Sequence, residues 1–464
     1  MFHTKEFDKE EFGPLELITL IAKEPRVARY IEQATLRYPA FARDPNLPQD
    51  PNLPRDHNLP RDPNLPRDLP DADDEGPLTA LFARSPYLTK AGLDWKAFYA
   101  QIKKDYALVT HYMQNAVAFL MTLLPNVRRL TLQLDWNPQE DAKKLLEVIV
   151  SEAKKPNSVL DERSLAQVTT FHHMFSRPND NLNEVGLFLD LPNVSQFMGQ
   201  DCVSIFSMSV PNEPYFRYGE ALETVHLRHA YFDEAAIRAL LRCTPRLKVL
   251  WYHHSQGGLD RRGERYSRKF LGDWDCRQFV MAIEAEVGHH LEELSLSTSA
   301  ALWRAFVHPG GASTRGFKRL QKLTLPLQFT FGNIQRAKLQ DVVANDSLGA
   351  CENEPLVCDL VPSSVSELTL QSRAMDDDEK ALKALFHNLA AIKKSKLPSL
   401  KRIFINHDGP SWFCKEDGYR AEYWRLCRAA EEVGVLMKMT HTDIPVEEGS
   451  WYPPVDSTTV YGFL

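Results

Sequence analysis

Three pairs of adjacent histidines are the residues whose type could bind a metal ion or carry a proton: His172–His173, His253–His254 and His289–His290. Neighbouring side chains on a strand point to opposite faces, so such a pair cannot easily bind one ion. HExxH and CxxC motifs are absent, and Cys351 and Cys358 lie seven residues apart with no histidine nearby. The sequence therefore predicts neither a metal site nor a cofactor.

Two charged runs could attract ligands. The run DDDE at 376–379 precedes a helical pattern, where carboxylates complement the helix dipole, and it lacks the spacing and glycine of an EF-hand. Five basic residues between 261 and 269 could attract an acidic partner or form only a solvated loop. Since there is no glycine-rich phosphate loop and no GxSxG, we expect no enzyme; the alternative is an enzyme with a dispersed site.

Composition limits the partners and the compartment. The 464 residues are 43% hydrophobic and carry 55 basic against 62 acidic side chains, a balance that does not suit duplex nucleic acid. Seven cysteines are an odd and dilute count, typical of a reducing compartment. The start has no signal-peptide pattern, and the longest apolar run, 116–124, is far shorter than the roughly 20 residues of a membrane span. We expect an intracellular protein, cytoplasmic or nuclear, that binds neither nucleic acid nor membrane.

A proline-rich hexapeptide repeat divides the N-terminal part of the chain. The units DPNLPQ, DPNLPR, DHNLPR and DPNLPR run from Asp44, followed by DLP and the acidic DADDE ending at Glu75. Proline removes amide donors and disfavours helix, and one leucine per unit cannot build a core. We expect residues 44–76 to form a linker without secondary structure, the alternative being a proline-rich docking ligand.

From residue 127 onward a second pattern recurs, apolar–x–x–apolar–x–apolar. Good copies begin at Val127, Leu222, Leu247, Leu291, Leu320, Val365 and Leu400, and weaker copies begin at Leu165, Leu182 and Val194. The second half of the pattern places two apolar side chains on one face of a short strand. One unit cannot bury that face alone, but stacked units bury a continuous core.

Helical segments lie between these copies, at 232–242, 276–287 and 378–392. Alternating strands and helices at this spacing predict an α/β fold, a leucine-rich-repeat solenoid with irregular repeats, a curved parallel sheet and outer helices. The expected order is an N-terminal helical and strand cap at 1–43, the linker at 44–76, a helical region at 77–126, repeats at 127–443 and a tail at 444–464.

Several segments resemble the fungal F-box/leucine-rich-repeat proteins with degenerate repeats. They are LPNVRRLTL at Leu124, LPNVSQFMG at Leu191, the stretch from Ala221 to Gly258, CRQFVMAIEAEVGHHLEELSL at Cys276 and LVPSSVSELTL at Leu360. The resemblance implies repeats that capture a protein substrate and an F-box that binds the adaptor of a cullin-type ubiquitin ligase. GPLELITLIAKEP at Gly13 echoes the start of an F-box, but the residues after it look like the segment that follows one. The sequence shows no clear F-box. Binding of the adaptor is therefore expected only if this segment acts as one.

The repeat pattern also predicts which side chains form the core and which face outward. The predicted core positions are Leu130, Leu132, Val225, Leu227, Leu294, Leu296, Leu323, Leu325, Leu368, Leu370, Ile403 and Ile405. The alternating positions should form a concave face, and the candidate partner-binding residues there are Arg129, Gln133, His226, Arg228, Trp251, His253, Lys322, Arg402, Phe404 and Asn406. Large aromatic residues at exposed positions favour a role in binding, the alternative being that loops fold over this face and bury them. We therefore expect a non-enzymatic protein-binding module whose partner the sequence does not identify.

Overall fold

The structure, a computed structural model, describes residues 13–37, 72–107, 114–133, 136, 138–156, 163–174, 182–200, 202, 219–254, 274–298, 313–327, 356–372, 378–407, 417–441 and 460–463. The chain divides into two compact units, residues 1–198 with 454–464 (unit 1) and residues 199–453 (unit 2). Each unit contains parallel strands and helices, which confirms an α/β fold. Within the described residues, none of the helices has the length and apolar character needed to cross a membrane.

Unit 1 begins with short helices around an aromatic core. They are α1 (Pro14–Lys23), α2 (Val27–Tyr30), α3 (Ala72–Ala83), α4 (Pro86–Lys90), α5 (Trp95–Ala107) and α6 (Gln114–Met121), with strand β1 (Gln33–Arg37) after α2. Phe82 of α3 stacks on Phe119 of α6 with ring centroids 3.7 Å apart, and its ring lies 4.7 Å from that of Tyr99 on α5. These contacts join three helices that are separated in the sequence.

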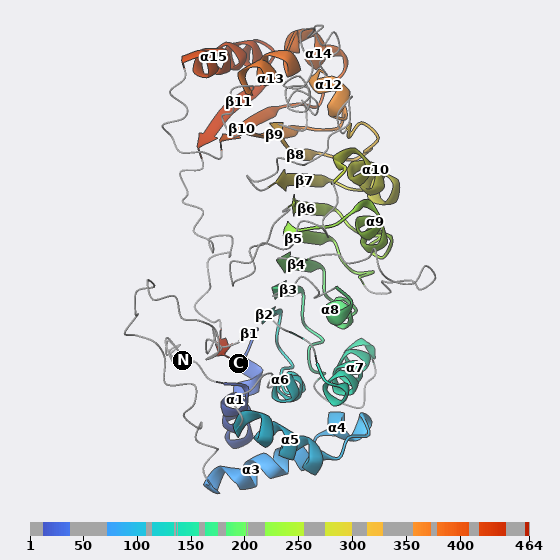
Figure 1. Ribbon diagram of the computed structural model, residues 1–464, viewed down its shortest axis with the longest axis vertical. Coiled ribbons are helices and arrows are strands. Elements are labelled where there is room, and N and C mark those ends of the chain that lie inside the picture. The colour runs from blue at the N-terminus through green and yellow to red at the C-terminus, as the bar shows by residue number, and fades with distance from the viewer. Residues whose placement is uncertain are drawn as a thin grey trace, which may run out of the picture. The chain divides into compact units, whose positions relative to one another are not determined.

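Unit 1 also holds a parallel sheet. Its further elements are β2 (Arg129–Gln133), α7 (Glu140–Lys154), β3 (Thr170–Met174), α8 (Leu182–Leu189) and β12 (Val460–Phe463), and β4 (Gln196–Gln200) crosses the division between the units. Pairing gives the order β12-β1-β2-β3, parallel throughout. Helices α6, α7 and α8 lie on one side of these strands (Figure 1).

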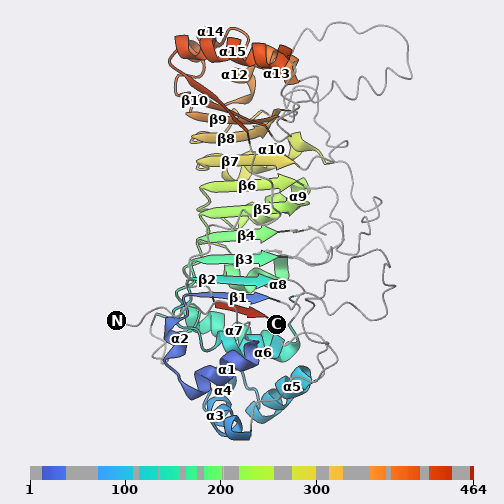
Figure 2. The same ribbon diagram turned by 90° about the vertical axis from the view of Figure 1, so that its left-hand side faces the viewer.

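Unit 2 repeats strand and helix along the chain. Its elements are β5 (Thr224–Ala230), α9 (Glu234–Arg242), β6 (Val249–His254), α10 (Cys276–Val287), β7 (Glu293–Thr298), β8 (Lys322–Pro326), α12 (Val357–Leu360), β9 (Glu367–Ser372), α13 (Asp378–Leu385), α14 (Leu389–Ser395), β10 (Arg402–His407), α15 (Asp417–Glu432) and β11 (Leu436–His441). Strands β5 to β11 pair in sequence order, all parallel. Figure 2 shows β5 to β8 face on, with α9 and α10 behind the strands.

The core positions predicted from the repeat are confirmed. All twelve predicted residues are buried, with at most 2% of each exposed. The registers explain this, because in-register parallel pairing places Leu250 beside Leu294 and Leu294 beside Leu323, so equivalent leucines form continuous rows. Helices α9 and α10 close this core, each beginning after an aspartate that accepts a hydrogen bond from a first-turn amide: Asp233 from Ala236 at 2.8 Å and Asp275 from Gln278 at 3.0 Å.

The prediction that residues 44–76 lack secondary structure is wrong for its last part, because helix α3 already begins at Ala72. The Glu75 carboxylate accepts hydrogen bonds from the Tyr99 hydroxyl at 3.1 Å and from Lys103 at 2.9 Å. These contacts attach the first turn of α3 to α5, and acidic residues there also complement the helix dipole. Residues 44–71 lie outside the described residues.

Two of the three weaker repeat copies do not form the strands expected of them. The segment LNEVGL is helix α8, because Leu–x–x–Val also fits the spacing of a helix. The copy assigned to Leu165 is shifted by three residues: Phe171 pairs with Leu130 and His173 with Leu132, so Val168 begins this repeat. The third copy is confirmed, since Val194 and Phe197 are buried around β4. The helix expected at 378–392 is instead two helices, separated at Asn388, which has a left-handed φ of 56°.

Helix α15 covers the outer edge of β11, the last strand of unit 2. The Leu436 amide donates to the Lys401 carbonyl next to β10, so Met437 and Met439 direct their backbone groups away from β10. The Tyr423 hydroxyl accepts a hydrogen bond from the Met439 amide at 2.6 Å, and the Cys427 thiol donates to the Met437 carbonyl at 3.9 Å. Side chains of α15 thus satisfy the backbone groups that an open edge would expose.

Candidate functional site

The side of β5 to β10 that points away from α9 and α10 is formed by the residues that alternate with the core; we call it the strand face. In Figure 2 it is turned toward the viewer, and no helix from the described part of the chain crosses β5 to β8 on this side. Half-buried residues of this face alternate with buried core residues along β6 and β7, and along β5 as far as Leu227. The strand face therefore offers side chains that are positioned by the core beneath them.

Four of these side chains form a contact series across neighbouring strands, the Trp251 row: His226 of β5, Trp251 of β6, Glu293 of β7 and Lys322 of β8. The imidazole of His226 stacks on the indole of Trp251 with centroids 4.2 Å apart and planes 7° apart. The indole N–H of Trp251 donates to Glu293 Oε1 at 2.7 Å, and the other carboxylate oxygen lies 3.2 Å from Lys322 Nζ.

The strand register produces this row. His226 lies directly opposite Trp251, and strands in a sheet are about 4.8 Å apart, which suits two stacked rings. Glu293 lies opposite both Val249 and Lys322, so it can reach the indole on one side and the ammonium on the other. The row is therefore held in place by the sheet and not by a loop.

Burial sets the charge of the row. It lowers the pKa of His226 to about 4, although the nearby Glu293 carboxylate acts in the opposite direction. His226 is thus neutral at neutral pH, which leaves Glu293 and Lys322 as an oppositely charged pair. The Trp251 row therefore presents two stacked rings next to an ion pair whose opposite charges balance.

A second set of polar side chains lies beside the row. His253 Nδ1 is 2.8 Å from Ser297 Oγ, and the His253 ring packs edge to face on that of His229 at 4.8 Å. Sequence reasoning missed His229, because the strand register shifts between Leu227 and Ala230 and His229 takes a left-handed φ of 50°. The segment HLRHAY, in which His229 follows a regular strand copy, contains no signal for such a bulge.

The structure brings together four of the ten predicted face residues, His226, Trp251, His253 and Lys322. Arg228 is half-buried on β5. On β10, Phe404 and Asn406 are half-buried, and Arg402 pairs with Glu367 at 2.8 Å. Arg129 and Gln133 lie on β2 in unit 1, where Arg129 Nη1 donates to Gln33 Oε1 at 3.5 Å. The side chain of Gln133 lies outside the described residues.

The histidine pairs on strands behave as predicted. His173 and His254 are buried, whereas their neighbours His172 and His253 are half-buried on the opposite side. Burial lowers the pKa of both buried rings to about 3. His289 and His290 lie in a turn instead of a strand, with their ring nitrogens 2.9 Å apart. Within the described ranges there is no group of three or more potential metal ligands.

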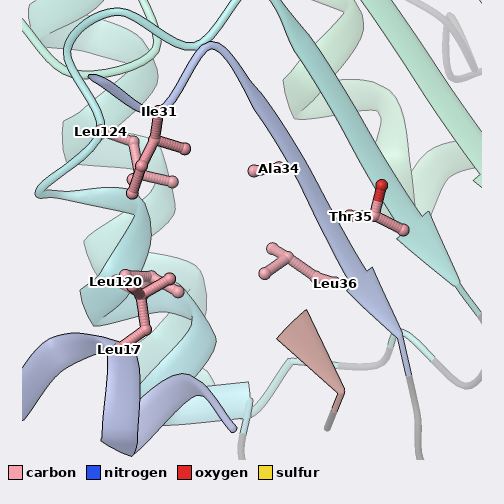
Figure 3. Close-up of a pocket in the computed structure, with 7 residues that line it drawn as sticks. All are labelled: Leu17, Ile31, Ala34, Thr35, Leu36, Leu120 and Leu124. Atoms are coloured by element: carbon pink, nitrogen blue, oxygen red, sulfur yellow. The ribbon is translucent and has the colours of Figure 1, made fainter. Parts of the chain in front are cut away.

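A small pocket in unit 1 is apolar and lies under β1 (Figure 3). It is lined by Leu17, Ile31, Ala34, Thr35, Leu36, Leu120 and Leu124, and its volume is about 10 Å³. Such a space is no larger than one water molecule, and its lining offers that water few polar partners. The pocket therefore does not form a ligand site, and the strand face of unit 2 is the better candidate.

No protein-family model matches the sequence, and no curated protein matches it either. The residues and geometry of the chain itself therefore carry the functional argument.

Proposed function

We propose that the chain is a non-enzymatic protein-binding module, a leucine-rich-repeat solenoid that holds a protein partner on the strand face of unit 2. The Trp251 row carries this proposal. Binding sites tend to centre on Trp, Tyr and Arg side chains that are partly desolvated and held rigidly, and Trp251 is fixed by a stacked ring and a hydrogen bond. Unlike its core neighbours, it lies on the side of β6 away from α9 and α10.

Affinity purification followed by mass spectrometry tests this proposal, with the full chain, its Trp251→Ala variant and a matched Thr369→Ala variant as baits. Thr369 is half-buried on the same face, three strands away. We expect Trp251→Ala to weaken recovery of the partner by roughly 30-fold, the effect of losing about 2 kcal/mol, and Thr369→Ala to leave it unchanged. Undiminished partner recovery by a folded Trp251→Ala chain would exclude the row as the binding site.

A stability measurement separates binding from packing. Leu250 precedes Trp251 and is fully buried, so Leu250→Ala gives the loss expected of a core residue. If Trp251→Ala destabilised the chain as much as Leu250→Ala, the indole would be a packing residue.

The resemblance to F-box proteins supports a narrower form of this proposal, in which the module is the substrate receptor of a cullin-type ubiquitin ligase. A pull-down with the full chain as bait should then recover the ligase adaptor together with the partner. Recovery of the partner without any adaptor would leave a leucine-rich-repeat scaffold unrelated to ubiquitination.

A further inference from the structure

The outer edge of unit 1 is covered by a strand that is distant in sequence. Strand β12 pairs in parallel with β1, with Ala34 opposite Val460 and Arg37 opposite Phe463. Residues 38–459 separate the two strands along the chain. In Figure 2 the two strands run side by side at the end of the unit 1 strands.

The backbone groups that meet β12 can be identified from the other side of β1. The Arg129 amide donates to the Glu32 carbonyl at 3.2 Å, so Glu32 and, by alternation, Ala34 face β2. Thr35 therefore faces the opposite way, toward β12. Because Thr35 lies opposite Tyr461, parallel pairing directs the amide of Gly462 at the Thr35 carbonyl, whereas the amide of Phe463 points away.

The two units close their sheets in different ways. In unit 2, Tyr423 and Cys427 of α15 satisfy single backbone groups at the edge of β11. In unit 1, the edge of β1 is met by a main-chain strand of only four residues, Val460–Phe463. An edge covered by main chain is one that can accept an extended peptide, since strand addition relies on the same backbone hydrogen bonds.

We propose that the outer edge of β1 is a docking site for a parallel peptide strand, and that residues 460–463 of the same chain are its resident, displaceable ligand. Four residues of pairing are weak in isolation, but tethering gives the segment a high local concentration. The partner class that fits the edge is therefore an extended peptide that resembles the chain's own VYGF segment. This site lies in unit 1 and is independent of the strand face proposed for unit 2.

A labelled peptide of residues 455–464, VDSTTVYGFL, tests the proposal by fluorescence anisotropy against the full chain. The variant Gly462→Pro removes the amide aimed at Thr35 and should release the resident strand, whereas Gly462→Ala retains that amide. We expect the peptide to bind the proline variant at least tenfold more tightly than it binds the natural chain or the alanine variant. A chain ending at Thr459 should behave like the proline variant, and circular dichroism verifies that both remain folded.

Backbone methylation of the peptide supplies the matched control. N-methylation at Gly462 should abolish binding to the proline variant, and N-methylation at Phe463 should preserve it, because only the first amide faces β1. Equal binding to all chains, no binding to a folded chain ending at Thr459, or equal effects of the two methylations would overturn the proposal. A dimer of the natural chain that dissociates in Gly462→Pro would assign the strand to a second copy and would also overturn it.

Discussion

Trp251 and Tyr252 are adjacent aromatic residues that serve opposite sides of strand β6. The Tyr252 hydroxyl accepts a hydrogen bond from the Phe232 amide at 2.9 Å and lies 3.0 Å from His254 Nδ1, deep in the core. Trp251 instead contacts His226 and Glu293 on the strand face. Strand alternation predicts this division from the sequence, but the contacts of Trp251 depend on the register with β5 and β7, which the sequence does not contain.

His173 is a titratable side chain at a core position, since it lies opposite Leu132 of the neighbouring strand and is buried. Its burial makes the stability of the chain depend on pH. Burial, and next the adjacent His172, lower the pKa of its imidazole to about 3, below the value of about 6.5 in an unfolded chain. Between these values the unfolded state binds a proton that the folded state does not. The part of the free energy of unfolding that depends on neutral His173 should therefore be fully present above about pH 6.5. It should be lost as the pH falls toward 3, by up to about 1.4 kcal/mol per pH unit.

The variant His173→Leu tests this prediction by denaturant unfolding at several pH values. We expect a shallower decrease in stability below pH 6.5, by about one proton, because leucine does not titrate. His387→Leu is the control, since its side chain is exposed and lies in unit 2, away from His173. Identical pH profiles for His173→Leu and the natural chain would show that folding does not lower the pKa of His173.

At the scale of elements, strict spacing is what made strands predictable. Leu294 and Leu296 follow Leu291 at the expected intervals, and α10 begins at Cys276 as its apolar spacing indicates. The segment LNEVGL has similar intervals and is a helix, because three-residue spacing fits both structures. The repeat at Val168 was missed because a histidine stands where the pattern requires an apolar residue.

Replacement of core leucines should destabilise unit 2 far more than replacement of strand-face residues. Leu294→Ala should lower the free energy of unfolding by about 2–5 kcal/mol, since the side chain is fully buried in the row of leucines. Ser295→Ala, one residue further on the strand face, should change it by less than about 0.5 kcal/mol. Equal effects on the thermal melting temperature would show that the faces of β7 are assigned the wrong way round.

The cover over β11 predicts a specific role for one hydroxyl. Tyr423→Phe keeps the ring but removes the oxygen that accepts the Met439 amide, which should cost about 1–3 kcal/mol and increase hydrogen exchange at that amide. Trp424→Phe is the control, because 55% of Trp424 is exposed. Unchanged exchange at Met439 in Tyr423→Phe would mean that the hydroxyl does not cover this edge.

At the scale of the whole molecule, the proline-rich repeat separates β1 from α3 in sequence. The composition of residues 44–71 predicts that a nonspecific protease cuts there first, since two prolines in most units oppose regular structure. Limited proteolysis with mass spectrometry of the products measures this. Early cuts inside β5 to β10, before any cut in 44–71, would contradict the prediction.

The division into two units predicts that binding and folding can be separated. A fragment of residues 191–453 retains β4 whole, the strand face with the Trp251 row, and the α15 cover over β11. Because its core rows of leucines run along β5 to β10 and its last edge is covered, we expect it to melt cooperatively in circular dichroism. It should also recover the same partner as the full chain, and Trp251→Ala should weaken that recovery as it does in the full chain. A fragment that melts cooperatively yet recovers no partner would place the binding site outside the strand face, whereas a fragment without a cooperative transition would show that unit 2 requires unit 1 to fold.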